Sequence, residues 1–488
     1  VFGPLLLLLF LMPLPWGSNN ETSMALFSAG FSSLLLLWLV LYVFNATSIK
    51  QRTWPASLWL SLLLWALWLG WIALQIVPLP MATVQHYSPA AAQMQQALGP
   101  LALNPGLATL SIDRGRTAMQ LILSGGYFSL YLLVLLCVNS PKRINWLLWT
   151  LTIAGLCQAF YGMHMTISGL EYGFFEKKKY GIGVATGTFV NRNHFAAYME
   201  LCLAAGTALV LADLGRWKGG GWKALVAAAI DTLLSAKFRA RVMLVVMAAA
   251  LILTRSRMGS VAFFAALAAC GMIFVLLRYR NFLLPSLIFF SSLVIIDLWV
   301  VQQYFGLDEV VERIENTDLE TEGRTLVFAD LKPLVESYKM TGSGLGSFAE
   351  AYMPFRNPEI SGYYDHAHNE YLEFAIETGF VGCALLGLLL LTHIVHAVRT
   401  MARRKTPVYA SAAFASLMAM AAMIAHSTAE FMLHIPAVAA SLVALMALGM
   451  GVQSKSRARR RNSSEMEDTQ ETEAWGSAGT ADERRTSA

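Results

Sequence analysis

Apolar residues are gathered into long runs that alternate with short polar connectors over most of the 488-residue chain. The runs are about 17–25 residues long, which is the length that a helix needs to cross roughly 30 Å of hydrocarbon. We count about twelve runs, of which the seventh is short: 1–16, 24–44, 56–78, 117–138, 144–163, 194–213, 242–254, 258–277, 282–303, 379–398, 408–426 and 434–452. The pattern predicts an all-α fold, a polytopic bundle of transmembrane helices.

Composition agrees with a membrane protein and excludes one very large soluble core. Hydrophobic residues make up 56% of the chain and charged residues 14%, and the mean hydropathy is +0.53. Soluble domains carry about a quarter charged residues. All five cysteines lie inside apolar runs, and their number and spacing favour neither a disulfide framework nor a metal site.

Lysine and arginine are concentrated in every second connector. These basic connectors hold Lys50, Arg52, Lys142, Arg143, the cations of 216–241, Arg278, Arg280, the cations of 399–405 and those of 457–461. Basic connectors stay in the cytoplasm, so both termini are predicted to be cytoplasmic. The connectors 79–116, 164–193 and 304–378 then fall on the opposite side of the membrane.

The chain is accordingly predicted to have four parts. A bundle of about nine spans (1–303) precedes a large helical extracytoplasmic loop (304–378), then come C-terminal membrane helices (379–452) and a polar tail (453–488). The tail is charged and poor in aromatic residues, which predicts disorder. A loop as long as 304–378 is usually functional, so we look for chemistry there.

Several arginines break the charge pattern by lying on the extracytoplasmic side, among them Arg192, Arg255, Arg257 and Arg324. Arg255 and Arg257 separate two spans with almost no connector. An arginine near the membrane core costs roughly 2.5–3.5 kcal/mol, so it is usually retained for an anionic partner. The alternative is that these side chains only extend to the lipid headgroups. Several guanidinium forks together suit a diphosphate.

His368 is the candidate general base, because an imidazole can accept a proton at neutral pH. We predict an amphipathic helix over 367–378 that begins with His368 on its apolar side and turns Glu370 toward water. His366 is the reserve candidate. A histidine that is merely hydrogen-bonded in a loop is the alternative. We do not expect zinc, since His366 and His368 share no helix face and no third ligand is spaced to join them.

Two further segments have more than one interpretation. The glycine-rich segment 342–346 follows no strand, so a turn with close backbone packing is favoured over nucleotide binding. The segment 426–436, which contains Glu430, connects the last two spans. Its polar side chains either line the same cavity or cap the helix ends.

Four blocks of sequence resemble the O-antigen ligase and polymerase superfamily, the Wzy/WaaL-type membrane glycosyltransferases. The blocks are 187–195, 256–257, 323–324 with 341–348, and 366–379, and segment 426–436 extends them. The resemblance implies a metal-independent, inverting transferase of the GT-C type without a cofactor. Its implied donor is an undecaprenyl-diphosphate-linked oligosaccharide, and its acceptor is a glycan, either a lipid-linked repeat unit or lipid A core.

The resemblance also implies roles for individual residues. Arg257 and Arg324 would bind the diphosphate, and His368 would assist the acceptor hydroxyl. Arg192 follows the family pattern less closely, because relatives often have another residue between the two asparagines, and Arg255 joins this group by its position. The supporting residues are His366, Asn369, Tyr371, Asn191, Asn193 and Glu430.

The form of the motifs favours a polymerase of exopolysaccharide or O-antigen repeat units, with a chain-length regulator as a further partner. The alternatives are an O-antigen ligase, a protein O-oligosaccharyltransferase and, from another class, a transporter or flippase. Transporters usually bind charge at the membrane midplane, whereas here the candidate charges gather at one face. We therefore predict an enzyme of the bacterial inner membrane, with its active site facing the periplasm and with no nucleic-acid partner.

Overall fold

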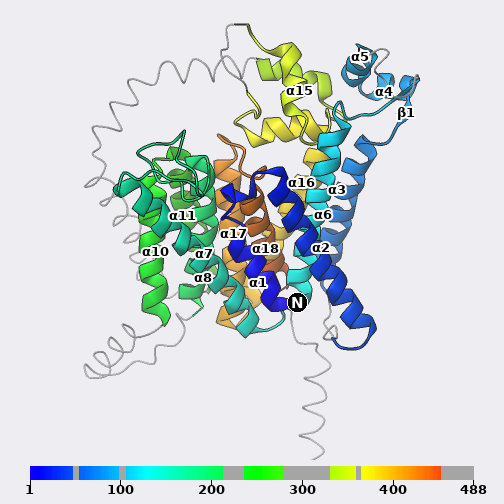
Figure 1. Ribbon diagram of the computed structural model, residues 1–488. Helices are drawn as coiled ribbons and strands as arrows, with labels where there is room; N and C mark the ends of the chain where they lie inside the picture. Colours follow the sequence, from blue (N-terminus) through cyan, green and yellow to red (C-terminus); the bar gives the residue numbers. More distant parts are fainter. Residues whose placement is uncertain (48–53, 98–105, 213–235, 279–329, 359–363, 452–488) are drawn as a thin grey trace, which may run out of the picture.

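The protein is an all-α bundle of membrane-spanning helices, as a computed structural model shows (Figure 1). The structure describes residues 1–47, 54–97, 106–212, 236–278, 330–358 and 364–451. Among these residues, eight helices are long and apolar enough to cross a membrane. They are α2 (Glu21–Val43), α3 (Ala56–Gln75), α6 (Arg114–Cys137), α7 (Pro141–Ile167), α8 (Arg192–Leu211), α11 (Arg257–Arg278), α16 (Glu370–Arg403) and α17 (Pro407–His426).

Three more apolar helices complete the described bundle: α1 (Phe2–Leu11), α10 (Ala236–Leu253) and α18 (Pro436–Gly451). Each predicted run therefore coincides with a helix except 282–303, which lies outside the described residues. The seventh run is longer than expected, because α10 begins at Ala236 rather than near residue 242. The predicted tail 453–488 also lies outside the described residues.

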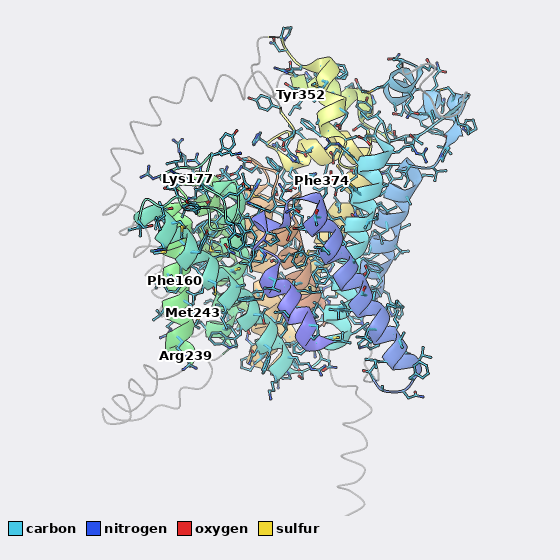
Figure 2. The ribbon with its side chains drawn as sticks, viewed as in Figure 1. Phe160, Lys177, Arg239, Met243, Tyr352 and Phe374 are labelled. Carbon is cyan, nitrogen blue, oxygen red and sulfur yellow. The ribbon has the colours of Figure 1, made fainter. Side chains whose placement is uncertain are left out.

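The membrane helices alternate in direction, so their basic ends gather at one end of the bundle. Arg278, the last residue of α11, donates hydrogen bonds to the main-chain carbonyls of Met401 and Arg404 at the end of α16. Figure 2 shows Arg239 of α10 near this end, and Lys177 and Tyr352 at the opposite one. The alternation predicted from the basic connectors agrees with this arrangement.

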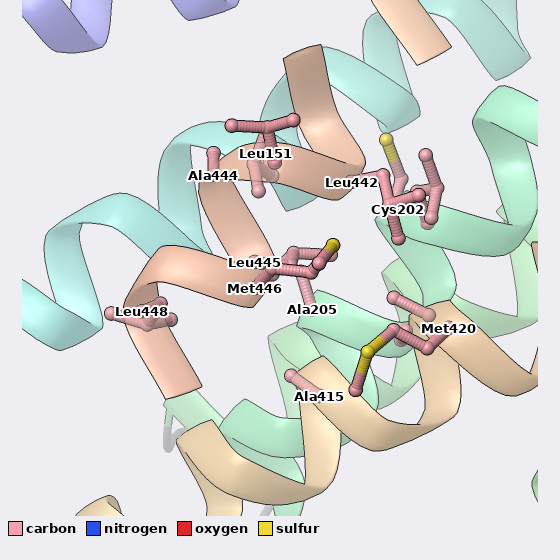
Figure 3. Packing of buried hydrophobic residues seen from close by; sticks show 14 of the residues in the cluster. Leu151, Cys202, Ala205, Ala415, Met420, Leu442, Ala444, Leu445, Met446 and Leu448 are labelled. Carbon is pink, nitrogen blue, oxygen red and sulfur yellow. The ribbon is translucent and has the colours of Figure 1, made fainter. Parts of the chain in front are cut away.

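The core of the bundle is formed by α8, α17 and α18, which are surrounded by the other helices (Figure 1). The membrane-crossing part of α8 is completely buried within the described structure. Its small side chains, such as Cys202 and Ala205, pack against Met420 of α17 and Leu442 of α18 (Figure 3). Small residues let helix backbones approach closely. Van der Waals packing of this kind holds membrane helices together, because the hydrophobic effect does not drive helices together within lipid.

A second, smaller hydrophobic cluster lies beyond one end of the bundle. It involves α4 (Met81–Tyr87), α5 (Pro89–Ala97), the strands β1 (Leu79–Pro80) and β2 (Leu107–Ala108), α15 (Phe348–Tyr352) and the short helix η5 (Met353–Phe355). The two strands pair antiparallel. Leu334, Tyr352 and Ile376 are among its buried residues, so this cluster attaches the outer segments to the first turns of α16.

The glycine-rich segment 342–346 is a tight turn packed against α16, as predicted. Gly342 has φ +75°, and a Cβ atom there would overlap the main-chain carbonyl of Glu377. Gly379, with φ +64°, lies against the carbonyl of Met340 and kinks α16. Both sites exclude a side chain, because glycine alone adopts this backbone region at low cost and admits such close contact. The turn thus fixes the outer end of α16.

Candidate active site

Polar side chains converge at this outer end, where α8 and α16 begin, α17 ends and segment 427–435 connects α17 to α18. The connector is joined to the start of α16 by several hydrogen bonds. The main-chain N–H of Glu370 donates to the carbonyl of Ser427 at 3.0 Å. Asn369 donates from its side-chain amide to the carbonyl of Thr428 at 2.9 Å. The connector between α17 and α18 therefore holds the residues at the start of α16 in position.

His368 is paired with a buried carboxylate. Its Nδ1 atom lies 2.9 Å from Oε2 of Glu430, whose other oxygen accepts a hydrogen bond from Nδ2 of Asn193 at 2.6 Å. The Glu430 side chain is 4% exposed and that of His368 is 29% exposed. A carboxylate on Nδ1 holds the tautomer in which Nε2 carries a lone pair. The carboxylate therefore fixes the orientation of an imidazole that is partly exposed.

His368 precedes α16, so the prediction that it begins an amphipathic helix is wrong. Asn369 is the N-cap, and its Oδ1 accepts a hydrogen bond from the main-chain N–H of Leu372. Asparagine is a strong N-cap residue, which explains why the helix starts at Glu370. His368 itself has φ +49°. Backbone strain of this kind is often found at functional sites, where surrounding contacts hold it in place.

The face of α16 that carries Glu370, Glu373 and Glu377 is buried, which corrects the prediction that Glu370 meets water. These three residues, called the glutamate cluster below, are 2%, 0% and 1% exposed. Glu370 accepts hydrogen bonds from the Ser427 hydroxyl and the main-chain N–H of Leu433, both at 2.7 Å. Sequence periodicity missed this, because the buried partners come from the distant connector. Tyr371, one of the predicted supporting residues, is 48% exposed and donates a hydrogen bond to the Ile424 carbonyl.

His434 lies among the three carboxylates. Its Nδ1 is 3.1 Å from Oε1 of Glu370, and its Nε2 is 3.4 Å from Glu373 and 3.5 Å from Glu377. Burial by itself lowers the pKa of His434, but the carboxylates, Glu373 foremost, outweigh burial and raise this pKa well above its usual value. An imidazolium ion therefore balances part of the negative charge of the glutamate cluster.

His366 is also bound by the glutamate cluster. Its Nδ1 lies 2.5 Å from Oε1 of Glu373, whose other oxygen accepts from the main-chain N–H of Ala367. His366, Glu373 and His434 present donor atoms within 4.8 Å of one another. His368 is not part of this group, but two residues that the sequence spacing did not suggest lie beside His366. Residues distant in sequence supply the group that spacing did not reveal.

Phe431 contacts three histidines at this site. Its ring stacks on His366 at a centroid distance of 3.8 Å, and it meets His368 and His194 edge-on at 5.2 Å and 4.7 Å. The connector therefore supplies both the carboxylate that holds His368 and the ring against which it rests. For segment 426–436, lining the site describes the structure better than capping helix ends.

Asn191 and Asn193 stand at the start of α8. Asn191 is its N-cap, and the side-chain oxygen accepts from the main-chain N–H of Asn193. This contact positions Asn193 for its hydrogen bond with Glu430. Arg192, partly exposed, is the first residue of α8 and lies between these two asparagines.

Arg255 and Arg257 lie at the same end of the bundle and are exposed. Arg255 has φ +53°, and Arg257 begins α11. The first turn of α11 approaches the other helices of the site, since a Cβ on Gly259 would lie 3.2 Å from Cε1 of His426. Three of the four predicted arginines, Arg192, Arg255 and Arg257, thus lie at the same outer end of the bundle. Arg324 lies outside the described residues.

One buried ion pair beneath the site was not predicted. Glu200 of α8 and His426 of α17 are 0% exposed, and their side chains are 2.7 Å apart. The signal was present in the sequence, because Glu200 is an acidic residue inside an apolar run. Ionisable residues at such depth are costly and usually paired or functional.

Comparison with known families agrees with the sequence blocks. The family model described as O-antigen ligase (Wzy_C) matches residues 242–387, which include most of α10, all of α11 and α15, and the first half of α16. About a third of the chain, residues 242–387, is thus similar to the O-antigen ligase family. The predicted resemblance to the O-antigen ligase and polymerase superfamily is therefore confirmed. A search of curated proteins found no match. Members of this family are glycosyltransferase-like enzymes, and the matched residues of this chain contain His368 and Arg257.

Proposed function

We propose that the protein transfers a glycan from an undecaprenyl-diphosphate donor to a sugar hydroxyl on the extracytoplasmic side of the bacterial inner membrane. The observation that carries the proposal is the His368–Glu430–Asn193 arrangement, which binds Nδ1 of a partly exposed histidine at the same end of the bundle as Arg192, Arg255 and Arg257. The basic connectors support the orientation, with both termini in the cytoplasm. The family match supports the reaction class.

The chemistry is a single displacement with inversion at the anomeric carbon. His368 accepts the proton of the acceptor hydroxyl through Nε2 while the oxygen forms its bond to the anomeric carbon. The bond between this carbon and the diphosphate oxygen breaks, and the diphosphate leaves with both electrons. Glu430 stabilises the imidazolium that forms. Arg257 and Arg324, with Arg192 and Arg255, stabilise the negative charge on the leaving diphosphate. No step of this mechanism requires a metal.

Polymerisation of lipid-linked repeat units fits the motif forms, and the matched family description favours ligation to lipid A core as the second candidate. Both reactions use the same donor chemistry and differ in the acceptor. Purified full-length protein supplied with donor and either acceptor distinguishes them, since a polymerase lengthens the lipid-linked glycan and a ligase modifies only the core acceptor.

The role of His368 is tested by comparing His368→Ala with His366→Ala in that assay. We expect His368→Ala to lower turnover by about 10²–10⁴-fold, the usual range for general base catalysis, with donor binding preserved. His164→Ala is the matched control, because His164 is an exposed histidine of α7 outside the site. Selective loss in His366→Ala with normal turnover in His368→Ala would move the role to His366.

A further inference from the structure

Four donor atoms of the kind that bind transition metals converge behind His368. Ligand atoms of His366, Glu373 and His434 lie within 4.8 Å of one another. Glu373 Oε1 is 2.5 Å from His366 Nδ1 and 3.4 Å from His434 Nε2, and Glu377 Oε2 lies 3.5 Å from His434 Nε2. They come from segment 366–369, from two turns of α16 and from the connector 427–435. Imidazole nitrogen and carboxylate oxygen are common ligands of Zn²⁺.

Two of these atoms have no hydrogen-bond partner among the described residues, although they are buried. They are Glu377 Oε2, in a residue that is 1% exposed, and His434 Nε2, in a side chain that is 7% exposed. They lie 3.5 Å from each other, at ion-pair distance but farther apart than in an ordinary hydrogen bond, and a cation that bonds to both would satisfy them. A metal ion that binds there takes the place of the proton that Nε2 of His434 otherwise carries.

In metal sites, the ligating side chains usually form hydrogen bonds through the atoms that do not bind the metal. His434, Glu373 and Glu377 have such hydrogen bonds. Glu370 lies on Nδ1 of His434, the main-chain N–H of Ala367 donates to Oε2 of Glu373, and that of Phe348 donates to Oε1 of Glu377. Ligating histidines almost always donate their other ring N–H to a carboxylate or carbonyl. These contacts orient Nε2 of His434, Oε1 of Glu373 and Oε2 of Glu377 toward the common point.

The charge of the glutamate cluster also favours a cation. Three carboxylates that are at most 2% exposed face two imidazoles, those of His366 and His434. Even with both imidazoles protonated, the carboxylates remain in excess by one charge. A divalent cation carries the same charge as these two protons. Unlike the protons, it can bond at the same time to Glu377 Oε2 and His434 Nε2. The His366 side chain, 23% exposed, gives an ion access from solvent.

We propose that His366, Glu373, Glu377 and His434 bind one divalent transition-metal ion, for which Zn²⁺ is the best fit. Two nitrogen and two carboxylate ligands suit tetrahedral Zn²⁺. The 2.5 Å separation of His366 Nδ1 and Glu373 Oε1 has to widen to about 3.3 Å, the ligand–ligand distance for bonds of about 2.0–2.1 Å. The ion joins the segment that carries His368 to α16 and the connector. This role is structural and does not rest on the proposed reaction.

The test measures metal directly in the full-length protein in detergent. The protein is purified without chelator, incubated with ZnCl₂, desalted and analysed for metal content, and Co²⁺ is added in parallel for its visible absorption. We expect about one Zn²⁺ per chain and the intense bands of tetrahedral Co²⁺. Glu377→Gln keeps an oxygen for the Phe348 N–H, so the fold is preserved, and it should lower Zn²⁺ affinity at least about tenfold.

Glu370→Gln changes the side chain on Nδ1 of His434 and leaves the four proposed ligands in place, so it should lower Zn²⁺ affinity about 10–100-fold. His164→Ala is the control and should bind as the wild type does. Less than about 0.1 Zn²⁺ per chain in the wild-type protein, together with no Co²⁺ bands, would show that the cluster holds protons only and would overturn the proposal. Equal metal content in wild type and Glu377→Gln would place the ion elsewhere and would overturn it as well. Neither readout depends on transferase activity.

Discussion

If Glu430 acts on the reaction only by holding His368, substitutions at the two positions should not add. Glu430→Gln keeps the shape of the side chain and removes its charge. The lost contact is the 2.9 Å hydrogen bond between His368 and a carboxylate that is 4% exposed. A hydrogen bond to a charged group contributes about 1.5–3 kcal/mol. At 1.36 kcal/mol per tenfold, Glu430→Gln should lower turnover about 10–150-fold.

The assay is a double-mutant cycle on purified full-length protein with lipid-linked oligosaccharide as donor. Wild type, Glu430→Gln, His368→Ala and the double variant are compared under single-turnover conditions. His368→Ala should lose about 10²–10⁴-fold, and the double variant should lose no more than that, within about threefold. Donor KM should change little in all four proteins, because the arginines are untouched.

His164→Ala again serves as the control, and thermal unfolding of each variant shows that the bundle is intact. A double variant whose loss equals the product of the two single losses would mean that Glu430 and His368 act independently. That result would refute the oriented-base interpretation. A large loss of donor affinity in Glu430→Gln alone would assign Glu430 to the donor side instead.

Three further predictions follow from the structure. Arg257→Lys should lower donor affinity about 10–150-fold, since lysine lacks the fork that binds two phosphate oxygens, and unchanged donor affinity would sink this assignment. Tyr180→Cys should react with an impermeant thiol reagent from outside intact cells and Arg239→Cys only after permeabilisation; the reverse result would invert the orientation. Gly342→Ala should lower stability by about 1–3 kcal/mol in thermal unfolding, because its Cβ meets the Glu377 carbonyl at positive φ. Gly387→Ala, with nothing within 4 Å, should not destabilise.

Sequence alone determined the membrane architecture, because the requirement behind it is local. A helix must keep about twenty apolar residues together to cross the bilayer, so each span is visible in its own segment. The runs near 117–138 and 408–426 thus appear as α6 and α17 with little change of bounds. The positions of glycine in segment 342–346 likewise indicated a turn, since positive φ and close contact are local demands.

The tertiary structure alone decided which side chains face one another at the outer end of the bundle. Glu370 looks solvent-facing in a helix considered by itself, yet it is buried because Ser427 and Leu433 cover it from a connector some sixty residues away. The pairing of His368 with Glu430, and of His434 with the glutamate cluster, likewise joins segments far apart in the chain. Spacing within one segment cannot reveal such contacts, because they depend on how α8, α16, α17 and α18 pack together.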